Sequence, residues 1–347
     1  STPVFQRCAC AMWLSCTRSA QSQPHIPNAM EVIVLAGGFG TRLRPLTEDR
    51  AKPLLPILDQ PLLQRVVEVV PSELIDRVIV AAGFGIEEMR DWATNAELPY
   101  EVVLSVEDEA MGTGGAIALA REHLSGEGPV LVLNGDLVSS VEVESLLKHH
   151  KTTGALATLS LWEVEDPSRF GVCELDNSGF IRRFQEKPAP GTEFSNLINA
   201  GCYLVEREIL DNLRLENHSM EREVFPEIAA SGNMAGISFI GYFVDAGTPS
   251  SFIQAAKVCI ESKRFSSGFK CCESWFADGA RFGDVTRSSI GKGVHLGDSS
   301  SITDSVIMDS AWIGDGCKLE GCIVGEGARI SAGSKLSETV VGHHSNV

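Results

Sequence analysis

The sequence lacks any run of about 18 consecutive apolar residues, so it does not predict a membrane-spanning helix. Basic residues are also too few for a polyanion-binding surface, because the 347 residues carry a formal net charge of −17. Proteins that bind nucleic acids or anionic membranes in general rely on a broad basic surface. We therefore expect no nucleic-acid partner and no membrane partner. The charge of any anionic ligand must then be met by individual Arg and Lys side chains.

The ten cysteines lack the spacing of a metal site. No CxxC pair occurs, and no histidine lies near a cysteine at metal-ligand spacing. Reduced thiols in a cytoplasmic protein are the simpler interpretation, and we expect a cytoplasmic location.

The first 29 residues lack acidic side chains but contain Arg7, Arg18 and several serines. This composition loosely resembles a transit peptide. Met30, however, stands directly before the first apolar run and would make a natural start. We therefore interpret residues 1–29 as a disordered leader or an upstream extension, with targeting as the alternative.

From Met30 onward, short apolar runs such as "EVIVLA", "RVIVAA" and "PVLVLNGD" alternate with helix-like segments. Continuous β-branched runs bounded by glycine or proline, and separated by helices, are typical of a sheet that is covered on both faces. The sequence therefore predicts an α/β fold with a parallel or mixed sheet. Ligands of such sheets bind at the carboxyl ends of strands, where a glycine loop comes after Ala36 and Asn134-Gly135-Asp136 comes after Leu133.

After Lys151 the pattern becomes richer in strands, with "ALATLSLWEV", "FGVCELD" and "INAGCYLV" among them. This predicts an α+β extension of the sheet, which is a plausible place for a second substrate. A helix then begins after Thr248, the expected N-cap, with Pro249 at its first position.

Beyond about residue 285, aliphatic residues recur every six positions, and each new set starts 17 residues after the last. Such a hexapeptide repeat predicts a β-solenoid in which each triangular coil buries one aliphatic residue per side. The expected boundaries are an α/β domain at 30–263, a linker at 264–285 and a solenoid at 286–347. The repeat positions are Ile290, Leu296 and Ile302; Ile307, Ile313 and Leu319; Val324, Ile330 and Leu336; and Val341 and Val347.

The glycine loop "LAGGFGTRLRPLT" does not match the common phosphate-binding fingerprints. A dinucleotide fingerprint needs a third glycine at the position of Leu43, and a Walker loop needs a lysine directly after its glycines. Instead, the basic residues after these glycines include Arg42 and, further along the chain, Lys52. Glycines allow backbone N–H groups to approach a triphosphate closely, and these two side chains can supply the positive charge that its β- and γ-phosphates need.

The longer stretch "LAGGFGTRLRPLTEDRAKPLLPI" resembles the signature of the sugar-1-phosphate nucleotidyltransferases, also called nucleotide-diphosphosugar pyrophosphorylases. The similarity extends over roughly residues 30–263, and a hexapeptide tail occurs in many members. One departure is Ala51, where many members have proline before the lysine, and it affects loop stiffness more than chemistry. The resemblance implies a Rossmann-like mixed-sheet nucleotidyltransferase domain followed by a short left-handed β-helix.

The resemblance also implies site residues. Asp136 in "NGD" and Asp245 in "VDAGTP" match the positions that hold Mg²⁺ in the family, and two carboxylates can hold one hard cation on phosphate oxygens. The implied nucleotide-binding positions are Leu35, Ala36, Gly37, Gly38, Gly40, Thr41, Gly112, Thr113 and Gly135.

A sugar site is implied by later motifs. In "FQEKP", Glu186 matches a residue that binds a sugar hydroxyl, and Lys187 matches one that binds the phosphate of the sugar phosphate. Gly171, Asn199 and Gly201 match positions that line the family's sugar pocket, although strand-end packing also explains the glycines. The form "GTGG" at 112–115 looks most like that of the guanylyltransferases of mannose 1-phosphate and heptose 1-phosphate.

The implied reaction transfers a nucleotidyl group, in the first place GMP from GTP, to a sugar 1-phosphate, with mannose 1-phosphate favoured. Arg42 and Lys52 would hold the leaving pyrophosphate, and Lys187 the attacking phosphate. Open alternatives are a heptose-1-phosphate guanylyltransferase, a uridylyl or thymidylyl transferase acting on glucose 1-phosphate, and a catalytically silent nucleotide-sugar-binding subunit. A glycosyltransferase would more naturally show Asp-x-Asp than Asn-Gly-Asp. We also expect a homo-oligomer, with the solenoid as a candidate interface.

Overall fold

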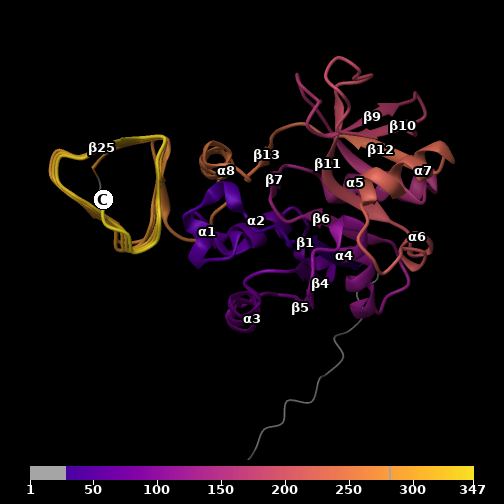
Figure 1. Ribbon diagram of the computed structural model, residues 1–347, viewed down its shortest axis with the longest axis horizontal. Helices are drawn as coiled ribbons and strands as arrows, with labels where there is room; N and C mark the ends of the chain where they lie inside the picture. Colours follow the sequence, from indigo (N-terminus) through magenta and orange to yellow (C-terminus); the bar gives the residue numbers. More distant parts are fainter. Residues whose placement is uncertain (1–28, 281–282) are drawn as a thin grey trace, which may run out of the picture.

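The protein consists of an α/β domain and a β-helix that lies beside it, as Figure 1 shows. The structure is a computed structural model, and it describes residues 29–280 and 283–347. The predicted leader therefore lies outside the described residues, apart from Ala29. Within the described ranges, no helix is both long enough and apolar enough to cross a membrane.

A nine-stranded mixed sheet forms the centre of the α/β domain. Its main order is β10-β9-β11-β6-β1-β4-β5, and β8 pairs with β11 and β12. β1 is parallel to β4 and β6, whereas β11 is antiparallel to β6. The strands are β1 (Met30–Leu35), β4 (Ile75–Ala82), β5 (Glu101–Val106), β6 (Val130–Asn134), β8 (Ala157–Glu163), β9 (Gly171–Leu175), β10 (Ile181–Glu186), β11 (Leu197–Val205) and β12 (Met234–Ser238).

Helices cover both faces of this sheet, as the sequence predicts. Successive side chains of a strand point to opposite faces. Val32 and Val34 of β1 belong to one hydrophobic core, and Ile33 between them belongs to the other. The first core includes side chains of α2 (Leu62–Val67), α3 (Ile86–Asn95), α5 (Val143–Thr153) and α8 (Pro249–Glu261). The second includes side chains of α4 (Gly112–Ala120), α6 (Arg207–Asp211) and α7 (Phe225–Ala230). The predicted start of α8 is confirmed, because Thr248 and Ser251 form a capping box there.

Short elements lie between the main strands and helices. After β1 come a 3₁₀ turn (Thr41–Leu43), α1 (Leu46–Asp49), a second 3₁₀ turn (Lys52–Leu54), and the short strands β2 (Pro56–Ile57) and β3 (Gln60–Pro61). After β6, β7 (Leu137–Ser139) pairs in antiparallel fashion with β13 (Phe243–Asp245). Further 3₁₀ turns span Ser72–Leu74 and Arg121–His123, and a π-helical turn spans Met220–Val224.

The C-terminal region is a parallel β-helix whose coils stack as a triangle in Figure 1. Strand pairing aligns the predicted repeat positions from coil to coil, for example Ile290 with Ile307 and Ile307 with Val324. Val347 keeps this register, because its backbone forms hydrogen bonds with Arg329 and Ser331, but it is 47% exposed. The strands are β14 (Phe269–Cys271), β15 (Ser274–Phe276), β16 (Asp284–Thr286), β17 (Ser289–Ile290), β18 (His295–Leu296), β19 (Ser301–Thr303), β20 (Val306–Ile307), β21 (Trp312–Ile313), β22 (Lys318–Glu320), β23 (Ile323–Val324), β24 (Arg329–Ile330), β25 (Lys335–Ser337) and β26 (Val340–Val341).

The segment 264–285, expected from the sequence to be a linker, contains strands of the β-helix sheets. β14 and β15 form a hairpin within it, and β15 pairs in parallel with β17. Trp275 belongs to the core of the α/β domain, whereas the next residue, Phe276, belongs to the core of the β-helix. The stack therefore begins before residue 286. Its first strands do not follow the six-residue repeat, which is why the sequence pattern does not reveal them.

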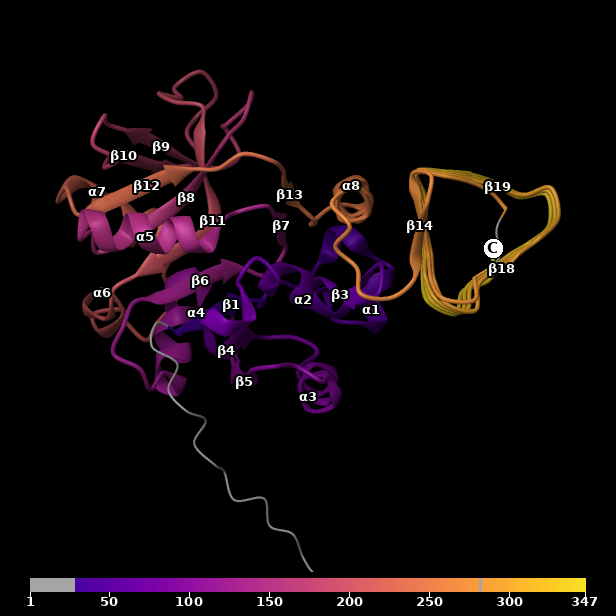
Figure 2. The same ribbon diagram turned by 180° about the vertical axis from the view of Figure 1, so that it is seen from behind.

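One side of the β-helix packs against the α/β domain, next to α1 and α8 (Figure 2). Val306 and Ile323 of that side share a hydrophobic core with Phe252 of α8. Lys257 of α8 also forms an ion pair with Asp304 of the β-helix. The two parts thus share buried apolar surface and a charged contact.

We expect Leu319→Ala to lower the free energy of unfolding of the β-helix by about 2–5 kcal/mol, because Leu319 is buried and its removal leaves a cavity. The matched control is Lys318→Ala, one residue earlier on the exposed side of the same strand, which should change it by less than about 0.5 kcal/mol. Urea unfolding followed by circular dichroism measures both, and equal effects would contradict the alternation of buried and exposed positions.

Candidate active site

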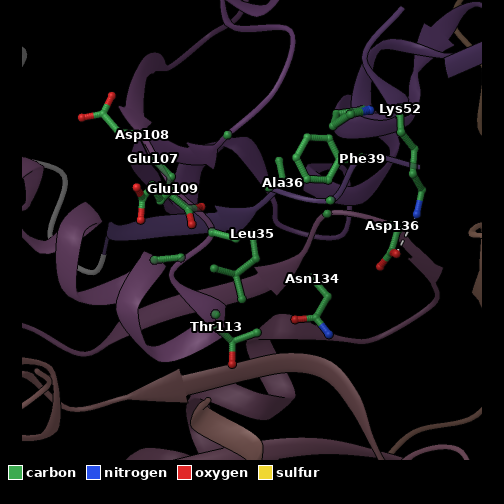
Figure 3. A pocket seen from close by; sticks show the side chains of 18 residues that line it. Leu35, Ala36, Phe39, Lys52, Glu107, Asp108, Glu109, Thr113, Asn134 and Asp136 are labelled. Atoms are coloured by element: carbon green, nitrogen blue, oxygen red, sulfur yellow. Dashed lines mark hydrogen bonds and ion pairs between the residues drawn. The ribbon is translucent and has the colours of Figure 1, made fainter. Parts of the chain in front are cut away.

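A cavity of about 390 Å³ opens where β1 and β6 end, at the edge of the sheet where the sequence predicts a ligand. The glycine loop after β1, the acidic segment after β5 and the residues after β6 form its walls, and Figure 3 shows their side chains. The lining residues are Leu35, Ala36, Gly37, Gly38, Phe39, Lys52, Pro53, Gly83, Glu107, Asp108, Glu109, Ala110, Gly112, Thr113, Ala116, Asn134, Gly135 and Asp136.

Most of the predicted nucleotide-binding residues lie together in this cavity. Leu35, Ala36, Gly37, Gly38, Gly112, Thr113 and Gly135 line it, as do Lys52 and Asp136. Gly40 and Thr41 do not line it. Gly40 has a structural reason to be glycine, because its φ is 64° and a Cβ there would lie 2.9 Å from Cβ of Lys52.

The first two glycines of the loop differ in their surroundings. A Cβ at Gly37 would lie 2.9 Å from Oε1 of Glu107, whereas a Cβ at Gly38 would meet nothing within 4 Å. Gly37 therefore allows the close approach of the Glu107 carboxylate. The backbone at Gly38 stays open toward the cavity, as the approach of a phosphate requires.

Acidic side chains surround one end of the cavity. Glu107 is only 8% exposed, and its Oε2 accepts a hydrogen bond of 3.1 Å from the backbone N–H of Met111. Asp108 and Glu109 lie beside it and are exposed. The acidic start of "EDEAMGTGG" is visible in the sequence, but the burial of its first carboxylate is not, and Glu107 is absent from the predicted site.

An ion pair between a buried lysine and a partly exposed aspartate lies at the other end of the cavity. Nζ of Lys52 is 2.7 Å from Oδ2 of Asp136, and the pair is drawn as a dashed contact in Figure 3. Nearby, the side-chain oxygen Oδ1 of Asn134 is buried and has no hydrogen-bond partner within the described part of the chain. An unsatisfied buried acceptor at a cavity wall is typical of a group that meets a ligand.

The pairing of β7 with β13 brings Asp245 next to Asp136. The backbone N–H of Ala246 donates a 2.9 Å hydrogen bond to the carbonyl of Asp136. Oδ1 of Asp245 accepts a 2.9 Å hydrogen bond from the N–H of Gly247. A Cβ at Gly247 would lie 2.5 Å from Nη2 of Arg42, so this glycine leaves space for the guanidinium beside Asp245. Arg42 and Asp245 thus lie next to the cavity without lining it.

The hydroxyl of Thr113 is already engaged by the protein. It donates a 2.6 Å hydrogen bond to Oε2 of Glu221 and accepts one of 2.9 Å from the N–H of Met220. The backbone of His218 occupies the space where a Cβ of Gly112 would stand, 2.5 Å from its carbonyl oxygen. The first turn of α4 is therefore tied to the segment 216–221, and Thr113 contributes its other atoms to the cavity.

The predicted sugar-binding residues form a second group on β9, β10 and β11, outside this cavity. Glu186 pairs with Gly171, and a Cβ at Gly171 would lie 3.0 Å from the carboxylate of Glu186. Oδ1 of Asn199 accepts a 3.0 Å hydrogen bond from the N–H of Gly201. Gly201 has φ 63°, and a Cβ there would lie 2.6 Å from the amide nitrogen of Asn134, so it joins this group to the cavity wall.

Charge is concentrated around Glu186. Nζ of Lys187 is 3.5 Å from its Oε1, and the Lys187 side chain is 58% exposed. Burial raises the pKa of Glu186, and the nearby carboxylate of Glu221 raises it further, while Lys187 and Arg222 act in the opposite direction. The positive charges of Lys187 and Arg222 thus only partly offset the effects of burial and of Glu221 on Glu186. This is expected for a carboxylate that receives hydrogen bonds from a polar ligand.

Comparisons with known proteins match both domains of the chain. The model of the nucleotidyl transferase family matches residues 31–262, and that of the GlmU-like C-terminal hexapeptide matches residues 256–344. Mannose-1-phosphate guanylyltransferase 1 of Arabidopsis thaliana is 34% identical over 287 residues, which are 81% of this chain and 78% of that protein. The probable mannose-1-phosphate guanylyltransferase 3 of Oryza sativa subsp. japonica is 34% identical over 290 residues, which are again 81% of this chain and 78% of that protein. Among solved structures, HddC from Yersinia pseudotuberculosis complexed with GMP-PN has a TM-score of 0.55 and 25% identity, covering 65% of this chain and 98% of that one.

We expect Glu186→Gln to raise the melting temperature at neutral pH. Because the pKa of Glu186 is raised in the folded protein, ionisation of this carboxyl lowers stability as the pH rises from its ordinary value of 4.5 through the raised value. The neutral amide avoids this loss of stability. The gain in melting temperature should therefore shrink as the pH falls toward 4.5. Glu174→Gln, at an exposed position of the neighbouring strand, is the control and should show no such dependence. A gain independent of pH would refute this explanation.

Proposed function

The chain belongs to the nucleotidyl transferase family, and we propose that within it the protein transfers GMP from GTP to mannose 1-phosphate, releasing pyrophosphate. The names of its plant relatives support this choice of base and sugar. The observation that carries the proposal is the arrangement of charged groups at the two ends of the cavity. A buried carboxylate stands at one end, and a buried lysine with a second carboxylate stands at the other.

We propose that Glu107 binds the guanine base. Guanine presents an N1–H and an exocyclic amino group side by side, and one carboxylate can accept hydrogen bonds from both. Glu107 is buried in the cavity wall, and only its Oε2 receives a hydrogen bond from the described protein. Charge-assisted hydrogen bonds of this kind are stronger than neutral ones, so they can select the base.

The glycine loop and Lys52 would bind the phosphates. Gly37 and Gly38 line the cavity, and their labelled neighbours Ala36 and Phe39 lie between the acidic end and the Lys52–Asp136 pair in Figure 3. Lys52 would neutralise the leaving pyrophosphate, and Arg42, next to Asp245, would add a second positive charge. These cations would create a local positive field in a protein of net charge −17.

The residues around Asp136 fit a magnesium ion. Strand pairing holds Asp136 and Asp245 next to each other, and each carboxylate has one oxygen that accepts no hydrogen bond from the described residues. No third His, Cys, Asp or Glu completes a metal cluster within the described ranges. Water and phosphate oxygens would thus be the other ligands, as magnesium prefers. Bound there, the ion would neutralise charge on the phosphates.

The sugar 1-phosphate would bind across β9, β10 and β11. Glu186 would accept hydrogen bonds from sugar hydroxyls, and Lys187 would hold the phosphate. Gly171 makes room for the side chain of Glu186, and the hydrogen bond from the Gly201 N–H orients Asn199. This group adjoins the cavity through Gly201 and Asn134, so the two substrates could meet at the ends of β6 and β11.

The reaction needs positioning more than covalent catalysis. An oxygen of the sugar phosphate attacks the α-phosphorus of GTP in line, a new P–O bond forms, and the bond to the β-phosphate breaks so that pyrophosphate leaves. Lys187 would orient the attacking phosphate, and Lys52 and Arg42 would stabilise the charge on the leaving group.

We further propose that this takes place in the cytoplasm, where the free thiols of the described chain, such as Cys202 and Cys259, would stay reduced. Assembly into a homo-oligomer stays a prediction.

A pyrophosphate-release screen tests the proposed function. We expect GTP with mannose 1-phosphate to give the highest kcat/KM among pairs of GTP, UTP, dTTP, CTP and ATP with mannose, glucose, heptose and N-acetylglucosamine 1-phosphates. Asp136→Asn should keep the fold but lower kcat on the order of a hundred-fold or more, because the amide cannot provide the negative charge for the ion. Higher activity with another pair would replace the substrate assignment, and binding without turnover by the unmodified protein would indicate a silent subunit.

The proposed base contact is tested by Glu107→Gln. We expect kcat/KM for GTP to fall roughly ten- to a hundred-fold, since the amide cannot accept hydrogen bonds from both guanine donors. The kcat/KM for UTP should change little, so the ratio of kcat/KM for GTP to that for UTP should fall. Glu109→Gln, in the same cavity wall but exposed, is the matched control. An equal loss for GTP and UTP would remove Glu107 from base recognition.

A further inference from the structure

The chain segment just before Lys52 contacts the β-helix. Nη2 of Arg50 is 2.7 Å from Oε2 of Glu326, with side chains 30% and 36% exposed. α1, which ends at Asp49, lies beside the β-helix in both views (Figures 1 and 2). The segment that carries Lys52 is thus linked to an element far away in the sequence.

Glu326 is itself held in place by the next coil. Its backbone N–H donates a 3.0 Å hydrogen bond to Nδ1 of His343, a side chain that is buried. Burial lowers the pKa of His343 and Arg50 lowers it further, against the carboxylates of Glu326 and Asp49, and this direction favours the neutral imidazole that accepts the hydrogen bond. A Cβ at Gly342 would lie 3.1 Å from the ring of Pro45, so the coil also packs closely on the start of α1.

The same segment is held from the opposite side by α3. The backbone N–H of Ala51 donates a 3.0 Å hydrogen bond to Oε2 of Glu88. Gly85 precedes α3 with φ 65°, and a Cβ there would lie 2.5 Å from Cβ of Ala51. Arg50 and Ala51 are therefore fixed between two elements, and the next residue is Lys52, with its Nζ on Asp136.

On one side, the ion pair between Arg50 and Glu326 borders a cavity. This cavity has a volume of about 510 Å³ and is lined by both Arg50 and Glu326 and by residues of both domains. Because this space is not filled by side chains, packing on this side cannot replace the ion pair, and the other contacts of the segment are those of Ala51 with α3 and of Pro45 with Gly342.

We propose that the β-helix positions the triphosphate-binding segment through Glu326 and Arg50. Both are positioning residues: they act on Lys52 through the backbone of residues 50–52 and touch no reacting atom. Binding of the triphosphate requires Lys52 at the end of β6, and a segment that is free to move would be competent only part of the time, which weakens apparent affinity. This inference rests on the proposed nucleotidyl transfer.

Steady-state kinetics of the full chain test the inference. Arg50→Ala and Glu326→Ala should each raise KM for the triphosphate by up to about five-fold, the range of a partly exposed ion pair, with KM for the sugar phosphate unchanged. The reversed pair Arg50→Glu with Glu326→Arg should restore it. Lys257→Ala is the matched control, because Lys257 also joins the domains through Asp304 but lies in α8, away from residues 50–52. The same rise with Lys257→Ala, or a rise for both substrates, would overturn the inference in favour of a general effect of domain docking.

Hydrogen exchange of the free protein gives a readout that needs no turnover. The amides of Ala51, Leu54 and Leu55 are hydrogen-bonded in this segment, and Glu326→Ala should speed their exchange by up to about five-fold without lowering the melting temperature. Unchanged exchange together with unchanged KM would overturn the inference. Failure of the unmodified protein to turn over any substrate pair would instead refute the proposed function, and the exchange result would still decide whether the β-helix holds the segment.

Discussion

The ion pair between Lys52 and Asp136 is the contact on which the arrangement of the site depends. It joins the segment after β1 to the end of β6, two strands that lie side by side in the sheet. A largely buried charge is stable only with its partner, so the two segments must stay together. The glycines support this contact, because Gly40 makes room for the stem of Lys52 and Gly135 lets its segment approach the carbonyl of Leu35.

Much of the fold follows from local patterns. Continuous apolar runs such as Val32 to Leu35 predict strands that are buried on both faces, and the six-residue repeat predicts a β-helix whose register is then seen from coil to coil. These features depend on side chains close in sequence, and a periodic pattern records them directly. The predicted ligand-binding edge of the sheet is likewise where the cavity lies, because strand ends define it.

Other features depend on contacts between distant segments, and no local pattern contains them. Glu107 resembles any exposed acidic residue until the fold buries it against Gly37. Thr113 lines the cavity as predicted, but the sequence does not show that its hydroxyl binds Glu221, more than a hundred residues away. β14 and β15 lie outside the six-residue repeat, although Trp275 and Phe276 of β15 contribute to two different cores.

That division between two cores has a consequence for how the chain can vary in length. In β15, Trp275 and Phe276 are adjacent and point to opposite sides, one into each core. Inserting or deleting a single residue just before them would exchange their directions, because side chains alternate along a strand. The large indole would then face the narrow interior of the coil, and the phenyl ring would leave a space under α8. The connection between the two domains therefore tolerates substitutions more readily than changes in length.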